Sequence, residues 1–282
     1  MQPDPLANVL GVGVHAVDAA MACTRIEAAI ADGIRGYVCL TGVHGVMEAS
    51  RDPQFRSILS RAFLVAPDGM PTVWIGHLQG HQGMQRVFGP DLMLDLCRRS
   101  VEKGTTHFLY GGKPGVAGEL ADRLRLRFPG IRILGWYTPP FRPLSLKERH
   151  HLESRLRKLR PDFMWIGLST PKQERFMSEY CDRLDCGLMI GVGAAFDYHT
   201  GQLRDAPAWI KNSGLQWAHR LCQEPRRLWK RYLVNNSAFI ASIALQLSGL
   251  RRYELLTNAT EIARSPKSPK PTPISEALRS GD

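Results

Sequence analysis

The amino-acid sequence predicts an α/β fold, in which a mostly parallel sheet is flanked by helices and followed by a helical C-terminal appendage. Three observations support this prediction. Short apolar runs rich in β-forming residues alternate with segments of helical spacing. The runs are apolar at successive positions, which is typical of parallel strands covered on both faces. After about residue 203 such runs stop, and a helical, aromatic and basic segment follows.

The expected strands and helices alternate along the chain. Six runs are expected to form strands, and they lie at 36–42, 62–66, 106–112, 131–136, 162–168 and 187–193. Five segments with helical spacing lie at 51–61, 90–103, 114–128, 145–159 and 171–184. This order indicates repeated βαβ units.

The chain divides into three predicted parts: a core over 1–203, a basic helical appendage over 204–255 and a disordered tail over 256–282. Pro225 lies inside the appendage, where one helix is expected to end or kink. The stretch at 232–250 is interrupted by polar residues and is predicted to be a packed or amphipathic helix rather than a membrane span. The tail contains SPKSPKPTP and few large apolar residues, so it cannot form a core.

The composition is that of a globular protein with a surplus of positive charge. Hydrophobic residues make up 44% of the 282 residues and charged residues 22%, which is far from a disordered composition. Lysine and arginine exceed aspartate and glutamate by 37 − 26 = 11. A surplus of this size favours polyanionic partners, namely nucleic acid, anionic lipid or phosphorylated substrates.

The cysteines and the N-terminus narrow the expected compartment. The six cysteines form no C-x-x-C pair and show no zinc-site spacing, so no metal site is predicted and the thiols are expected to be reduced, as in the cytoplasm. The N-terminus has no basic region followed by an apolar run, so no signal peptide is predicted.

Candidate ligand-binding residues follow the expected strands, because ligands of open parallel sheets bind beyond the carboxyl ends of the strands. Gly111, Gly112 and Lys113 follow the strand at 106–110, before a helix expected to begin at Pro114. Glycines allow close backbone approach and a helix N-terminus favours anions, so this turn is a candidate phosphate site. The alternative is a plain strand-to-helix turn.

A second turn, STPKQE at 169–174, follows the strand at 162–168. Ser169 or Thr170 is expected to cap the next helix, and Glu174 to complete a capping box. That structural explanation leaves Lys172 and Gln173 unexplained, because a cation at a helix N-terminus is unfavourable unless an anion neutralises it. We therefore take Ser169, Lys172, Gln173 and Glu174 as candidate binding residues.

A third turn, GVGAAFD at 191–197, partly matches a dinucleotide-binding fingerprint through Gly191 and Gly193. Its sixth position is Phe196 instead of glycine or alanine, and no helix is predicted directly after it. Asp197 closes the turn. An NAD(P)-dependent oxidoreductase is therefore a less favoured alternative.

Asp68 follows the strand at 62–66 on a glycine-flanked turn. A carboxylate at a strand end is well placed for general-base work. The alternative is a turn aspartate that caps a helix starting near Pro71. Thr41 and His44 follow the first strand, and His44 is either a ligand for a hydroxyl or phosphate or a structural histidine.

The appendage interleaves cations with aromatic and apolar residues at helical spacing. Its cations are Arg220, Arg226, Arg227, Lys230 and Arg231. Such a helix suits the surface of an anionic membrane. The alternatives are a solvated, partly packed helix and a basic nucleic-acid-binding module, although no helix-turn-helix, zinc-finger or RNA-binding signature accompanies it.

Eight motifs together resemble the WecG/TagA/CpsF family of bacterial glycosyltransferases over about residues 8–235. They are the strand end at Thr41, RDPQFRSIL at 51–59, PDGMPTVW at 67–74, GPDL at 89–92, FLYGGKPGV at 108–116, IGLSTPKQERFM at 166–177, GVGAAFDYHTG at 191–201 and the segment at 204–233. Chance supplies one such piece, but not eight in order.

The resemblance implies a Rossmann-like hexosyltransferase that is inverting, independent of metal and free of cofactors. It implies transfer from a UDP-sugar, of the N-acetylmannosamine type or a glucose-type relative, to a polyprenyl-diphosphate-linked sugar in cell-surface or exopolysaccharide synthesis. The enzyme would be cytoplasmic, peripheral on the inner face of the plasma membrane, with an appendage that docks there and completes the site. Self-association away from the membrane is also implied.

The resemblance also assigns roles to residues. Asp68 would be the catalytic base. The resemblance implies no nucleic-acid partner. The charge of the departing UDP would be stabilised by fixed N–H groups and cations of the three turns, and Arg220, Arg226 and Arg227 would reach the lipid diphosphate. Many relatives carry Thr-x-Asn after the first strand, whereas this chain has TGVH at 41–44. His44 is expected to take over the contact of that asparagine, and the identity of both sugars is left open.

Overall fold

The computed structural model describes residues 5–256, apart from the side chains of residues 208, 212, 227 and 231; the predicted tail from 257 onward lies outside this range. Its centre is a six-stranded sheet in the order β4-β3-β8-β7-β5-β6, and all neighbouring strands run parallel. The strands are β3 (Gly36–Thr41), β4 (Leu64–Pro67), β5 (Thr106–Gly111), β6 (Arg132–Tyr137), β7 (Phe163–Gly167) and β8 (Leu188–Gly191). The predicted α/β fold and its six strands are confirmed.

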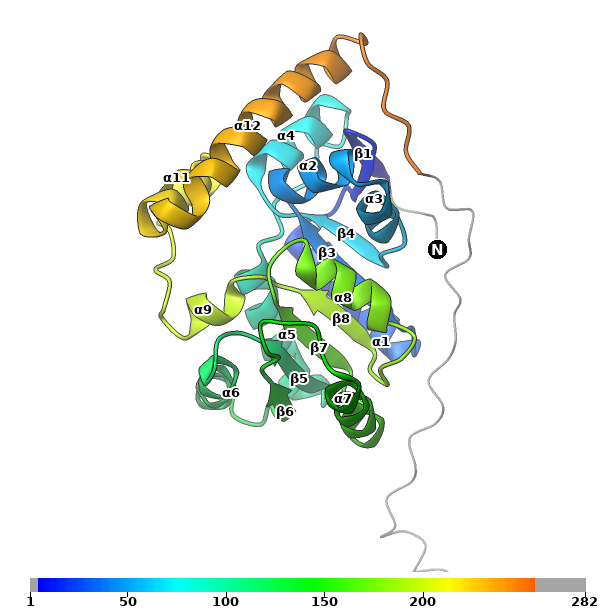
Figure 1. Cartoon of the computed structure of the whole chain (residues 1–282), viewed down its shortest axis with the longest axis vertical. Helices are drawn as coiled ribbons and strands as arrows, with labels where there is room; N and C mark the ends of the chain where they lie inside the picture. The colour runs from blue at the N-terminus through cyan, green and yellow to red at the C-terminus, as the bar shows by residue number, and fades with distance from the viewer. Residues whose placement is uncertain (1–4, 257–282) are drawn as a thin grey trace, which may run out of the picture.

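The central strands are apolar at successive positions because each face of the sheet is covered (Figure 1). In β7, Met164 and Ile166 join one buried cluster, while Phe163 and Trp165 join the other. Successive side chains of a strand point to opposite faces, so continuous apolar runs are required here.

The helices divide between the two faces. One face is covered by α2 (Val43–Arg51), α3 (Pro53–Ser60), α7 (Leu146–Leu159) and α8 (Lys172–Tyr180), and the other by α1 (Ala19–Ala31), α5 (Gly89–Lys103), α6 (Val116–Arg127) and α9 (Ala195–His199). The five predicted helices correspond to α3, α5, α6, α7 and α8. The predicted start at Pro114 was wrong by two residues, because the left-handed backbone of Gly115 delays α6 to Val116.

Several elements escaped prediction. They are the antiparallel hairpin of β1 (Leu6–Val9) and β2 (Val12–His15), together with α1, α2 and α9, whereas α4 (Met70–Leu78) matches the helix expected to start near Pro71. The expectation of no helix directly after GVGAAFD was wrong, since α9 begins at Ala195. A helix of five residues is too short to display a helical period.

The topology leaves a crevice at one edge of the sheet. From β3 the chain adds β4 on one side, then crosses to β5 and β6 on the far side, and returns to fill the centre with β7 and β8. All strands are parallel, so their carboxyl ends meet at one edge, and the reversal of strand order opens space there for a ligand.

The appendage comprises α10 (Ala208–Asn212), α11 (Gln216–Gln223) and α12 (Pro225–Leu247). Pro225 starts α12 just after α11 ends, as predicted for this proline. Helix α12 packs on α2 (Figure 1) and buries Leu228, Asn235, Phe239 and Ile243. Near its far end, the Gln246 side chain accepts a hydrogen bond from Leu10 N (2.9 Å) and donates one to Asn8 O (2.7 Å).

No helix within residues 5–256 is long and apolar enough to cross a bilayer.

The fold predicts that Gly111→Ala destabilises the protein. Gly111 has φ +127°, and a Cβ there would lie 2.5 Å from the carbonyl oxygen of Gly167 on the neighbouring strand. The backbone must shift to relieve this contact, so the free energy of unfolding should fall by about 2 kcal/mol or more. Urea denaturation measures the change. Gly83→Ala is the control, because nothing lies within 4 Å of its added Cβ; equal stability of the two variants would contradict the prediction.

Candidate active site

One cavity of about 1610 Å³ lies at the carboxyl ends of the strands, between the core and the appendage. Segments that follow all six strands of the sheet and all three helices of the appendage contribute to its lining. Of the residues predicted to form a site, the cavity is lined by His44, Asp68, Gly112, Lys113, Ser169, Lys172, Gln173, Gly191, Gly193, Asp197 and Arg220. The topology thus brings together residues that are 176 positions apart in the chain (220 − 44).

Four predicted binding residues lie outside the set of lining residues: Thr41, Gly111, Glu174 and Phe196. The last of these explains the altered fingerprint. An added Cβ would lie 3.3 Å from the Phe196 ring at Gly112 and 3.1 Å from it at Gly167. Phe196 is therefore a core residue packed against Gly112 and Gly167, and the sixth position of the fingerprint holds a buried aromatic ring instead of the glycine or alanine of a dinucleotide site.

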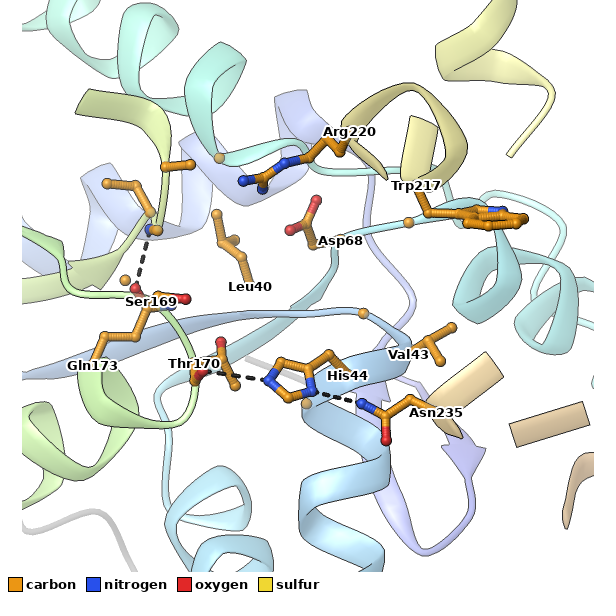
Figure 2. Close-up of a pocket in the computed structure, with 18 of the residues that line it drawn as sticks. Leu40, Val43, His44, Asp68, Ser169, Thr170, Gln173, Trp217, Arg220 and Asn235 are labelled. Carbon is orange, nitrogen blue, oxygen red and sulfur yellow. Dashed lines mark hydrogen bonds between the residues drawn. The ribbon is translucent and has the colours of Figure 1, made fainter. Parts of the chain in front are cut away.

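Asp68 follows β4 directly, and its position is fixed by the backbone. Its N–H donates to the carbonyl of Thr41 at 3.0 Å. A Cβ at Gly42 would lie 2.3 Å from the Asp68 carbonyl oxygen, so only glycine fits there. The capping alternative for Asp68 was wrong, because α4 begins after Gly69 with no side-chain cap. The carboxylate is half-buried and points into the cavity (Figure 2).

The surroundings of Asp68 make it a better base than a free aspartate. Burial raises the pKa of its carboxyl group; Arg86 and Arg220 oppose this rise and Asp91 adds to it. A carboxylate with a raised pKa accepts a proton more readily. Figure 2 shows the Arg220 guanidinium group on the same side of the cavity as this carboxylate.

The sequence analysis missed four cations that line the cavity: Arg86, Lys211, Arg142 and Arg175. The first two come from segments that do not follow a strand. Arg86 lies in the loop before α5, stacks over Phe88 with its guanidinium carbon 4.2 Å from the ring centre, and donates to Gln216 of α11. Lys211 of α10 pairs with Asp205, and its Nζ lies 5.3 Å from the centre of the same ring. Neither follows a strand, so the search at strand ends passed them by.

The turn at 169–174 is held by a network instead of a capping box. The prediction of a cap was wrong, since α8 has no side-chain cap. Gln173 accepts from Gly193 N (3.0 Å) through Oε1 and donates to Glu174 Oε1 (3.0 Å) through Nε2. The Thr170 hydroxyl donates to the same Glu174 oxygen at 2.8 Å. Gln173 and Glu174 thereby join the turn after β7 to the turn after β8.

This network changes which groups are available to an anion. The N–H of Gly193 is engaged by Gln173, and the N–H of Gly112 donates to Gly167 O at 3.1 Å. The fixed N–H groups expected at these two glycines are therefore used within the fold. Cationic side chains also line the cavity, among them Lys113 and Lys172 on the turns and Arg86, Lys211 and Arg220.

His44 occupies a junction between the core and the appendage. Its Nδ1 lies 3.0 Å from Asn235 Nδ2 of α12, and its Nε2 lies 3.3 Å from the Thr170 carbonyl (Figure 2). In the sequence, Asn235 is one of the polar residues that interrupt the apolar stretch at 232–250. Nothing in its local pattern marks it as a partner of a residue 191 positions away.

Two cations of α12, Arg226 and Lys230, are exposed and lie outside the lining of the cavity, whereas the side chains of Arg227 and Arg231 are outside the described part of the structure. Within residues 5–256, no three His, Cys, Asp or Glu side chains are grouped so that they could hold a metal ion.

The fold and the cavity define an α/β enzyme that presents a basic carboxylate among cations, as suits group transfer from an anionic substrate. The chain belongs to the WecG/TagA/CpsF family of glycosyl transferases, since the family's sequence model matches residues 7–253. The resemblance inferred from the motifs is confirmed, and the protein is a glycosyltransferase of the hexosyltransferase class.

Two curated relatives carry the same name, N-acetylglucosaminyldiphosphoundecaprenol N-acetyl-beta-D-mannosaminyltransferase. The relative from Bacillus spizizenii is 28% identical over 211 residues, which cover 74% of this chain and 80% of the relative. The relative from Bacillus subtilis is 29% identical over 185 residues, which cover 66% of this chain and 70% of the relative.

The burial of Glu174 predicts that the free energy of unfolding depends on pH. Burial raises the pKa of this carboxyl group, against the hydrogen bonds from Thr170 and Gln173. The pKa of Glu174 is therefore higher in the folded than in the unfolded protein. Its contribution to the free energy of unfolding is complete below the unfolded-state pKa and is lost as the pH rises through the folded-state pKa. Glu174→Gln keeps an acceptor for both donors and carries no charge. Its stability relative to the wild type should therefore grow from pH 4 to pH 8.

Denaturation in urea at both pH values measures this difference. Glu179→Gln, on the exposed side of the same helix, should show a much smaller dependence. If the difference in the free energy of unfolding between Glu174→Gln and the wild type is the same at both pH values, burial does not raise the pKa of the Glu174 carboxyl group.

Proposed function

We propose that this enzyme transfers a hexose, of the N-acetylmannosamine type or a glucose-type relative, from a UDP-sugar to a sugar on a polyprenyl diphosphate, in cell-surface or exopolysaccharide synthesis. The observation that carries the proposal is the placement of Asp68 in the shared cavity, close enough to Arg86 and Arg220 for both to affect its pKa. The names of the two relatives, which specify an N-acetylmannosaminyl group and a diphosphoundecaprenol acceptor, agree with it.

The proposed reaction is a single displacement with inversion. Asp68 accepts the proton of the acceptor hydroxyl as its oxygen forms a bond to the anomeric carbon. The bond between that carbon and the β-phosphate oxygen of UDP breaks, and UDP leaves from the opposite face. A carboxylate whose burial raises its pKa suits the role of proton acceptor.

The departing diphosphate requires positive charge, because negative charge builds up on its oxygen in the transition state. We assign this role to cationic side chains, with no metal required: Lys113 and Lys172 from the turns, and Arg86, Lys211 and Arg220 from the opposite wall. The donor would occupy the side of the cavity formed by Ser169, Gly191, Gly193 and Asp197. Arg220 belongs to α11, so the appendage would complete the site built by the core.

The division into a core over 1–203 and an appendage over 204–255 gives each part a role. Exposed apolar residues gather on the appendage and neighbouring α4: Trp74, Leu78, Trp209, Trp217, Trp229, Leu233 and Ile240. Tryptophan and leucine beside exposed cations suit insertion at the surface of an anionic membrane. We propose that this apolar face docks on the inner surface of the plasma membrane, where a lipid-linked acceptor lies, and that self-association covers it elsewhere.

Asp68→Asn should lower the transfer rate by about a thousandfold, because the amide accepts no proton while its size is nearly unchanged. The assay is release of UDP from a UDP-sugar in the presence of a polyprenyl-diphosphate-sugar. Affinity for UDP, measured by calorimetry, should persist. The activity of the wild type should also decline on acidification at a pH above the ordinary aspartate value, since the base must be ionised.

Asp95→Asn is the matched control, because Asp95 is a solvent-accessible residue of α5 paired with Arg98. Transfer by Asp68→Asn at a rate near that of this control would remove Asp68 from the reaction.

The pair of substitutions Trp229→Ser and Leu233→Ser should weaken binding to vesicles containing phosphatidylglycerol by about tenfold or more, since two large apolar side chains are lost from the docking face. Co-sedimentation measures the binding. Leu126→Ser is the control, because Leu126 is 82% exposed but lies on α6, away from the appendage. Equal vesicle binding by both variants would contradict the proposed face.

A further inference from the structure

A chain of three hydrogen bonds runs from the core, through the appendage, back to the turn at 169–174. Arg51 Nη1 of α2 donates to Asn235 Oδ1 of α12 at 2.8 Å. Asn235 Nδ2 lies 3.0 Å from His44 Nδ1, and His44 Nε2 lies 3.3 Å from the Thr170 carbonyl oxygen (Figure 2). We call these four residues the relay.

The direction of the relay is fixed by the chemistry of its two ends. Arginine can only donate and a backbone carbonyl can only accept. The Asn235 amide must therefore turn its oxygen to Arg51 and its NH₂ group to His44. His44 Nδ1 then accepts, and the ring proton lies on Nε2, which donates to Thr170. Glu48 also approaches Nδ1, but at 3.9 Å it is beyond hydrogen-bonding distance.

The relay ends at a residue that also holds the network of the same turn. The Thr170 hydroxyl binds Glu174, which binds Gln173, and Gln173 holds the N–H of Gly193. Asn235 is 95% buried (5% exposed) on the underside of α12. Its amide reaches His44 only where α12 is seated on α2. The same set of hydrogen bonds therefore links the position of α12 to the geometry of the turns after β7 and β8.

We propose that His44 and Asn235 are positioning residues, which order the turn at 169–174 for the donor when α12 is seated on the core. This inference rests on the proposed function, because it assumes that this turn receives the donor. It gives His44 a definite role: the ring contacts the appendage through Asn235 on one side and holds the turn at 169–174 through Thr170 on the other.

A second polar anchor of α12 provides a matched comparison. Gln246 bonds Leu10 N and Asn8 O near the other end of the helix and is not among the residues that line the cavity. Loss of either anchor should loosen α12 to a similar extent. Of the two anchors, Asn235 is the one that contacts His44. Its loss should therefore alter the turn at 169–174, whereas loss of Gln246 should not.

The test compares hydrogen exchange of residues 169–176 and UDP affinity in full-length Asn235→Ala, His44→Phe and Gln246→Ala. Asn235→Ala and His44→Phe should speed exchange of this segment and weaken UDP binding about fivefold, as expected for one hydrogen bond. Gln246→Ala should change neither. The double variant should bind UDP no more weakly than either single variant, because both break the same path. His44→Gln should restore most of the affinity, since its amide can accept and donate.

Exchange and UDP affinity in Asn235→Ala that match those of Gln246→Ala would overturn the relay, as would additive losses in the double variant. Two separate single variants guard against the case in which one fails to fold. A wild-type chain that binds no UDP would overturn the proposed function, and the exchange measurement would then still decide whether the relay exists.

Discussion

The site depends on the way in which β3 and β4 end together. Thr41 pairs with Pro67 at the last position of the parallel ladder, and the next N–H, that of Asp68, bonds back to Thr41. Gly42 lets the two chains approach so closely that an added Cβ would lie 2.3 Å from the Asp68 carbonyl. This backbone contact fixes the main chain of Asp68 at the edge of the cavity, and the proposed chemistry depends on that placement.

The second requirement is charge supplied by parts of the chain that follow no strand. A half-buried carboxylate is costly without nearby cations, and Arg86 and Arg220 provide them from the loop before α5 and from the appendage. Arg86 is in turn bonded to Gln216 of α11, so the loop and the appendage support each other. In the proposed reaction the core alone would have an incomplete site, and the seating of α10–α12 on the core would be required for transfer.

The sequence was most informative where the pattern was repetitive. Strands that are buried on both faces have continuous apolar runs, so the six strands could be predicted from the sequence. The turns that follow them, which carry Asp68 and Lys113, could then be located. Short elements such as α9 gave no periodic signal. Arg86, Lys211 and Asn235 could not be placed, because their importance arises from contacts between distant segments. Glu174 shows a third kind of limit: its spacing fits a capping box, yet the fold uses its carboxylate to bind side chains.

The most direct test of the central claim is a crystal structure of the protein soaked with UDP. The account predicts that the diphosphate lies in the shared cavity, against cations such as Lys113, Arg86 or Arg220, with its terminal phosphate facing Asp68 across the space for a sugar. A nucleotide bound elsewhere, with its diphosphate far from this carboxylate, would contradict the assignment of both the base and the cavity.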